Sequence, residues 1–168
     1  MNNKIILFFI CTLCTSGILA QHKTGHISDL KNEIKALSNE QVSGYLNGDG
    51  MGLAKAAELN HYPGPKHVLE FSEELNLTEE QVNKTNNLTI EMKENAISLG
   101  NQIIEKEKEL DSLFSKSIAE EKIVQSLLIA ISKLNGELRF VHIKAHLKQK
   151  EILSNEQINL YDKLRGYN

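Results

Sequence analysis

The sequence "LTEEQV" at residues 77–82 predicts where the longest helix of this chain begins. The hydroxyl of Thr78 can accept from an early helix amide, while Gln81 reaches back to the amide of Thr78, which together form a capping box. Leu77 can pack on the first turn as a hydrophobic staple. Related sequences occur twice more, "LSNEQV" at 37–42 and "LSNEQI" at 153–158. The repeats predict three helix starts of one kind.

Two long helices are predicted around the central box. The first should cover about 78–114, with apolar side chains on one stripe: Met92, Ala96, Leu99, Ile103, Leu110 and Phe114. The second should cover about 118–149, opened by a fourth capping box of Ser117 and Glu120. Its apolar residues alternate in steps of three and four, as in a coiled coil: Val124, Leu127, Ile131, Leu134, Leu138, Val141 and Ala145. The short polar link "SKS" predicts a long antiparallel helical hairpin.

Shorter helices are expected beside this hairpin, at 28–46, 51–59, 66–75 and 154–164. The glycines of "NGDGMG" (47–52) and both prolines of the chain, in "HYPGPKH" (61–67), should separate the first three. The predicted fold class is therefore all-α. A hairpin with one apolar stripe per helix cannot bury both of its sides, so shorter helices, a second subunit or a bound client must cover the remainder.

The N-terminal segment 1–20 is predicted to be a signal peptide. It has a basic start at Lys4, an apolar run that is short for a membrane span, and Ala20 at a cleavage point, with Gly17 as the rival position. Both cysteines of the chain, Cys11 and Cys14, lie within it. We therefore expect a periplasmic protein without disulfides, with an N-terminal helical segment at 21–49 and a helical domain at 50–168.

The composition of the mature chain argues against two function classes. Removing 20 of the 168 residues leaves 148, with 18 basic and 22 acidic side chains and a net charge of −4. No basic face or aromatic platform appears, so nucleic acid is not an expected partner. The mature chain also has no cysteine nucleophile, phosphate-binding glycine loop or His-Glu-x-x-His motif, so we do not expect an enzyme.

The six histidines occur in close pairs, and His142 with His146 is the most informative one. Residues four apart share a helix face, so both imidazoles can address one divalent transition metal, such as zinc, copper, nickel or cobalt. His61 and His67 could complete the site from the rigid Pro-Gly-Pro turn, with Glu70 or Met51 as further candidates. The alternative is that these histidines only form hydrogen bonds. The remaining pair, His22 and His26, is expected in an N-terminal tail.

Six positions carry a resemblance to a known family: Leu77, Thr78, Gln81, Leu153, Ser154 and Gln157. These paired boxes on an exported, helical chain resemble the LTxxQ-motif family of periplasmic proteins of the Spy/CpxP type. The stretch "GMGLAKAAELNHYPGPKHVLEFSEELNLTEEQ" (50–81) is similar to its heavy-metal-sensor-like, CnrX-type subgroup. The resemblance covers roughly 50–168, and 21–49 match more loosely.

The resemblance implies a four-helix fold wrapped into a curved hairpin that forms a homodimeric cradle. It also implies a chaperone role in envelope stress, in which unfolded protein clients are bound without ATP. The alternative is a periplasmic heavy-metal sensor that uses a histidine site and is read by a membrane-bound signalling partner. A helical module without a ligand is the third possibility. The mildly acidic mature chain differs from the strongly basic cradle of the best-known chaperone member, which weakens electrostatic capture of acidic clients.

Overall fold

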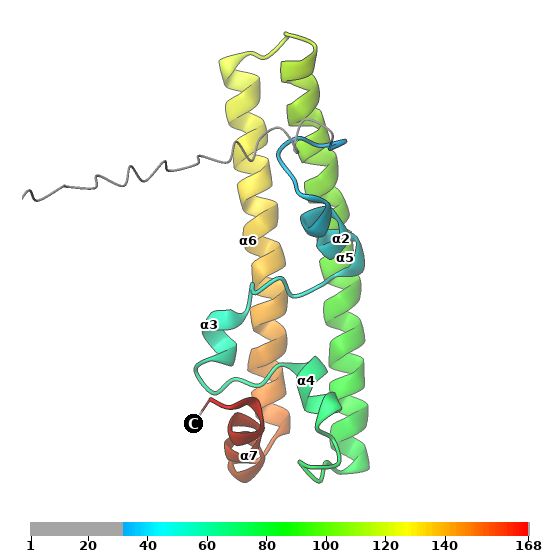
Figure 1. Cartoon of the computed structure of the whole chain (residues 1–168), viewed down its shortest axis with the longest axis vertical. Coiled ribbons are helices and arrows are strands. Elements are labelled where there is room, and N and C mark those ends of the chain that lie inside the picture. The colour runs from blue at the N-terminus through cyan, green and yellow to red at the C-terminus, as the bar shows by residue number, and fades with distance from the viewer. Residues whose placement is uncertain (1–31, 168) are drawn as a thin grey trace, which may run out of the picture.

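The computed structural model describes residues 32–167, which form helices, turns and bends with no strand among them (Figure 1). The longest elements are α5 (Glu79–Ser115) and α6 (Glu121–Ile152), of 37 and 32 residues. They lie side by side in opposite directions along the length of the molecule (Figure 1). The predicted all-α fold with a long antiparallel hairpin is confirmed. The predicted signal peptide (1–20) and the pair His22 and His26 lie outside the described residues.

The link between the two long helices differs from its prediction. Ser117 does not cap α6, which starts at Glu121 without a side-chain cap. Instead, Ser117 adopts a left-handed conformation with φ of 56° and ends α5. Its amide donates to the carbonyl of Phe114 at 3.0 Å, and the next amide, of Ile118, donates to Leu113 at 2.9 Å. This pair of bonds is a Schellman motif, in which the left-handed position is usually taken by glycine.

Four short helices complete the described fold: α2 (Asn39–Asn47), α3 (Lys55–Glu58), α4 (Pro65–Glu70) and α7 (Asn155–Arg165). α2 packs on α5, α3 packs on α6, and α4 contacts both long helices. α7 lies at the base of the hairpin, the end opposite the link between α5 and α6 (Figure 1). No helix within 32–167 has the length and apolar character needed to cross a bilayer.

Three of the short helices are shorter than predicted. Within the described part of the helix predicted at 28–46, residues 32–37 form bends and turns, and the helix begins after Ser38, because Ser38 and Gln41 form a capping box there. The helix predicted at 51–59 is reduced to α3, since Met51 and Gly52 both have positive φ and form a turn. The helix predicted at 66–75 stops at Glu70 and continues as turns to residue 76.

The core consists of two clusters along the hairpin. The middle cluster joins α2, α5 and α6 through Ile34, Leu37, Tyr45, Ala96, Ile103, Ile104 and Leu138. The base cluster joins α4 and α7 through Val68, Leu75, Leu153, Ile158 and Tyr161. The predicted seam of α6 is buried at Leu127, Ile131, Leu138 and Ala145. Phe114 was predicted on the seam of α5 and is 60 % exposed instead, because it lies at the tip of the hairpin.

Candidate functional site

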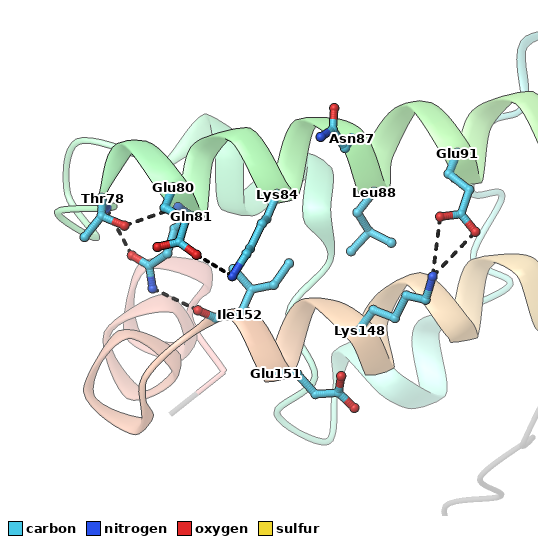
Figure 2. A pocket seen from close by; sticks show the side chains of 10 residues that line it. All are labelled: Thr78, Glu80, Gln81, Lys84, Asn87, Leu88, Glu91, Lys148, Glu151 and Ile152. Carbon is cyan, nitrogen blue, oxygen red and sulfur yellow. Dashed lines mark hydrogen bonds and ion pairs between the residues drawn. The ribbon is translucent and has the colours of Figure 1, made fainter.

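The predicted capping boxes at 77–82 and 153–158 both form, and their glutamines contact each other at the base of the hairpin. Gln81 Nε2 donates to Gln157 Oε1 at 2.8 Å, and Gln157 Nε2 donates back to Gln81 Oε1 at 3.1 Å. Gln81 also donates to the carbonyl of Ile152 at 2.9 Å, as Figure 2 shows, and Gln157 donates to the carbonyl of Leu75 at 3.2 Å. The two amides therefore tie four chain segments together.

Each glutamine also serves its own helix. Gln81 Oε1 accepts from the amide of Thr78 at 3.0 Å, and Gln157 Oε1 accepts from the amide of Ser154 at 2.9 Å. The leucines before the caps pack on the base cluster, Leu153 buried and Leu77 half-buried. The box at 37–42 forms as well, with Gln41 in the same role. These residues are structural, and the pairing of the two glutamines is a contact that the sequence pattern did not predict.

A polar groove runs beside Gln81 between the base halves of α5 and α6 (Figure 2). Four of its charged side chains form two pairs: Lys84 with Glu80 at 2.6 Å, and Lys148 with Glu91 at 3.4 Å. Bonding and attraction from Lys148 lower the pKa of Glu91, so this carboxylate is ionised at neutral pH. Glu151 also lines the groove, so three carboxylates face two lysine ammonium groups and the groove has only a small negative excess.

The turn "HYPGPKH" separates α3 from α4, so the predicted break between these two helices is confirmed. His61 adopts a positive φ of 65°, and Pro65 occupies the first turn of α4, where its missing amide donor has no cost. A Cβ atom at Gly64 would lie 3.0 Å from Cε1 of His146 and 3.1 Å from Oε2 of Glu58. The turn therefore packs closely against α6, at the face that carries His146.

Each of the three half-buried or exposed histidines has a bonding partner of its own. His61 Nδ1 lies 2.7 Å from Oδ2 of Asp162, a carboxylate that is only 2 % exposed. His67 Nδ1 lies 2.8 Å from Oε2 of Glu70, the next turn of the same helix. His146 Nδ1 lies 2.7 Å from the carbonyl oxygen of Tyr62. His146 therefore contacts the turn that contains His61, but the two rings bond to different partners: His61 to the carboxylate of Asp162, and His146 to the backbone of Tyr62.

His142 is the buried member of the group. It is 3 % exposed, and its Nε2 is buried without a hydrogen-bond partner. Burial lowers the pKa of His142, and the neighbouring His146 lowers it further, against a smaller upward effect of Asp49. The ring is therefore neutral at pH 7, and one nitrogen faces the interior unpaired.

The predicted metal ligands do not meet at one point. Within residues 32–167, no three side chains of histidine, cysteine, aspartate or glutamate are grouped so that they could hold an ion. His67 is paired with Glu70 and His61 with Asp162, whereas His142 and His146 are neighbours on α6. The metal site formed by His61, His67, His142 and His146 therefore stays a prediction.

Sequence reasoning missed a buried polar cluster centred on Glu58. Glu58 Oε1 accepts from the hydroxyl of Tyr161 at 2.5 Å and from that of Tyr167 at 3.0 Å, and Nε of Arg165 lies 3.4 Å away. Its second oxygen, Oε2, is buried without a hydrogen bond and lies 3.4 Å from Nδ1 of His146. Burial, followed by the contact with Glu58, raises the pKa of Tyr161, which keeps its hydroxyl protonated as a donor.

The Glu58 cluster fastens α7 and the residues after it to the rest of the fold. Tyr161, Arg165 and Tyr167 come from this end of the described chain, and Glu58 comes from α3. The only local signal for it was the presence of two of the few tyrosines within seven residues of each other. The cluster places charged side chains inside the protein, and its evident role is to attach α7 and Tyr167 to α3.

The tip of the hairpin exposes an apolar surface formed by Phe114, Ile118, Val124, Leu128 and Ile129, here called the tip surface. Phe114 and Ile129 are 60 % and 64 % exposed. Most of these side chains line a shallow groove between the end of α5 and the start of α6, together with Glu120 and Glu121. The short helices all lie farther down the hairpin, so none of them covers this groove (Figure 1).

No protein-family model, curated protein or solved structure matches the chain. The resemblance to the LTxxQ-motif family therefore rests on the sequence residues alone.

Proposed function

We propose that this chain is a periplasmic envelope-stress protein of the Spy/CpxP type, which binds apolar segments of unfolded proteins without ATP and without catalysis. The observation that carries the proposal is the tip surface. Large aliphatic and aromatic side chains are gathered there in the open, whereas apolar surface of this kind is usually covered in a soluble domain.

The groove at the tip suits an extended apolar segment better than a rigid, matched partner. It is shallow and open, and apolar side chains make up much of its lining. Binding would come from removing apolar area from water, which is non-directional and therefore tolerant of client sequence. The carboxylates Glu120 and Glu121 at the edge of the groove would favour clients with basic residues beside their apolar segments.

The tip surface is tested by the double substitution Phe114→Ser with Leu128→Ser. We expect this variant to need about tenfold more protein for half-suppression of client aggregation, because roughly 1.4 kcal/mol of apolar burial corresponds to tenfold in affinity. The measurement is light scattering of a chemically unfolded client diluted into buffer. The matched control is Ile90→Ser with Leu164→Ser, which removes exposed apolar side chains elsewhere. Equal loss in both variants, or no suppression by the original protein, would count against the proposal.

The second candidate function is that of a periplasmic heavy-metal sensor. One observation favours it: the neutral, buried ring of His142 has an unpaired Nε2, which is the form in which imidazole ligates a metal. Further ligands would have to come from a rearrangement of the turn at 61–67, because the present arrangement does not supply them.

Calorimetric titration with zinc, copper(II), nickel and cobalt tests this candidate. We expect binding tighter than millimolar that is lost in His142→Ala with His146→Ala, since both imidazoles would be ligands. Affinity should fall as the pH is lowered towards about 6, where imidazoles become protonated. The variant His67→Ala with Glu70→Ala is the comparison, because it removes the histidine and carboxylate that bond to each other on α4. Binding that is unchanged by the first double substitution rules out a site at these residues.

A further inference from the structure

The side of α6 that points away from the core carries large apolar side chains below the tip surface. Phe140 lies nine residues after the buried Ile131, and Leu147 lies nine residues after the buried Leu138. Nine residues make two and a half helical turns, so Phe140 and Leu147 project from the side opposite the core. Their exposed fractions are 58 % and 43 %. A helix side that meets only water usually carries polar residues instead.

Basic side chains follow both borders of this apolar row. Lys144 lies eleven residues after Lys133, and Lys150 lies eleven residues after Arg139. Eleven residues complete close to three helical turns, so each pair keeps to one side of the helix. Relative to Phe140, the first pair lies on one side and the second pair on the other. We call this surface the outer face, formed by Lys133, Arg139, Phe140, Lys144, Leu147 and Lys150.

Positive charge is gathered on α6 against the overall sign of the protein. Helix α6 has six basic and three acidic side chains, whereas α5 has four basic and eight acidic ones. The chain as a whole has a net charge of −3. Two carboxylates, Glu137 and Glu151, lie near the border of Lys133, which leaves the outer face with a small positive excess. An anionic partner therefore suits this helix better than any other part of the hairpin.

The basic groups of the outer face are only weakly engaged within the chain. Nζ of Lys133 lies 3.9 Å from Oε1 of Glu137, and Nζ of Lys144 lies 3.6 Å from Oε1 of Glu91. Exposed ion pairs of this kind contribute little to stability. Lys150 lies over the ring of Tyr62 at 3.8 Å, a contact that still leaves N–H groups for a further acceptor. These side chains can therefore turn to an external anion at low cost.

We propose that the outer face of α6 binds the surface of a bilayer that contains anionic phospholipids, with α6 parallel to the membrane plane. Phe140 and Leu147 enter the boundary between the headgroups and the acyl chains, and the basic groups at both borders contact lipid phosphates. Lysine and arginine suit such borders, because their stems cover apolar material while the charge stays among the headgroups.

A bilayer fits the outer face better than a protein segment does. All members of the face come from one helix, so the surface is convex, and lipids can rearrange around a convex surface. Both borders are positive, which matches a uniformly anionic surface, whereas a partner helix would need acidic residues along both of its edges. The inference does not rest on the proposed function, because no residue of the outer face belongs to the tip surface.

Flotation with lipid vesicles tests the proposal. Residues 21–168, which include the whole described fold, are mixed with phosphatidylcholine vesicles that contain about one third phosphatidylglycerol or none. We expect roughly tenfold tighter binding to the anionic vesicles, and weaker binding as salt is raised. Phe140→Ser with Leu147→Ser should lower the affinity about tenfold or more. Leu46→Ser with Ile90→Ser removes two exposed apolar side chains from α2 and α5, and this matched control should leave binding unchanged.

Charge removal tests the two borders. Lys133→Gln with Arg139→Gln removes one charge from each border and should weaken binding to the anionic vesicles about fivefold per charge. Lys106→Gln with Lys108→Gln makes the same change of net charge on α5 and should leave binding unchanged. Equal losses in the two variants would show that binding follows net charge rather than the outer face, which would overturn the proposal.

A single tryptophan reports where the protein meets the vesicle, because the chain has none of its own. Fluorescence of Phe140→Trp should shift to shorter wavelength when anionic vesicles are added, whereas that of Leu46→Trp should not. An equal shift at both positions, or no binding to anionic vesicles at low salt, would overturn the proposal. If Phe140→Ser with Leu147→Ser instead abolished binding of poly-glutamate or self-association, without vesicle binding, the occupant would be an acidic protein or a second copy and the proposal would be wrong.

Discussion

Replacing Glu58 with alanine is expected to lower the free energy of unfolding by about 3 kcal/mol. The substitution removes the acceptor of the hydroxyls of Tyr161 and Tyr167 and the counter-charge of Arg165. Tyr161 is fully buried, so its hydroxyl cannot turn to water when Glu58 is gone. Because these three residues belong to α7 and its extension, that end of the described chain should detach first. Urea unfolding, followed by circular dichroism and by tyrosine fluorescence, measures both effects.

The substitution Glu58→Gln separates the hydrogen bonds from the charge. An amide oxygen can still accept from Tyr161 and Tyr167, so the expected loss is about 1 kcal/mol, mainly from the contact with Arg165. Glu74→Ala, at an exposed turn position, controls for loss of a carboxylate and should change stability by less than about 0.5 kcal/mol. Equal losses for the alanine and glutamine variants would show that the Glu58 cluster is not held by accepted hydrogen bonds.

Replacing Gly100 with alanine is expected to cost about 3 kcal/mol, a large effect for the addition of one methyl group. Gly100 lies on α5 where the chain of α2 crosses it, and a Cβ atom would collide with the carbonyl oxygen of Tyr45 and lie 2.8 Å from its carbonyl carbon. The obstacle is backbone, so no side-chain rotation can relieve the clash. Either α2 moves away from α5 or both helices shift, and the middle cluster loses packing.

The same substitution at Gly136 provides the control for Gly100→Ala. Both glycines lie within long helices, so the intrinsic gain in helix propensity is the same, up to about 1 kcal/mol. At Gly136 there is open space around the new methyl group, so Gly136→Ala should raise stability. Thermal unfolding compares the two. If Gly100→Ala were also stabilising, the close crossing of α2 over α5 would be disproved.

The hairpin could be predicted from sequence because its signals are local. A capping box is complete within six residues, as at Thr78, and the seam of α6 repeats every three or four residues. The end of α5 could not be predicted, because the left-handed position of its Schellman motif is occupied by Ser117 instead of glycine. A serine three residues before a glutamate, as at Ser117 and Glu120, is typical of a capping box at a helix start. The local pattern therefore predicted the start of α6, whereas Ser117 ends α5.

The polar contacts of the site could be predicted only in part, because most of them join residues far apart in the chain. Glu58 and Tyr161 are separated by 103 positions, and His61 and Asp162 by 101. The helical spacing of His142 and His146 did predict that both lie on one side of α6. It could not predict that Nε2 of His142 would be buried unpaired while His146 would bond to the turn, since that depends on where the turn at 61–67 packs.

The contact between Gln81 and Gln157 has a consequence for the order of folding. These residues are 76 positions apart, whereas the link between α5 and α6 joins immediate neighbours in sequence. Loop-closure entropy favours contacts of short separation first, so the hairpin should zip from its tip towards its base. The glutamine pair would then form after the transition state. Weakening it should accelerate unfolding while leaving the folding rate almost unchanged, so that this end of the hairpin governs the lifetime of the native state.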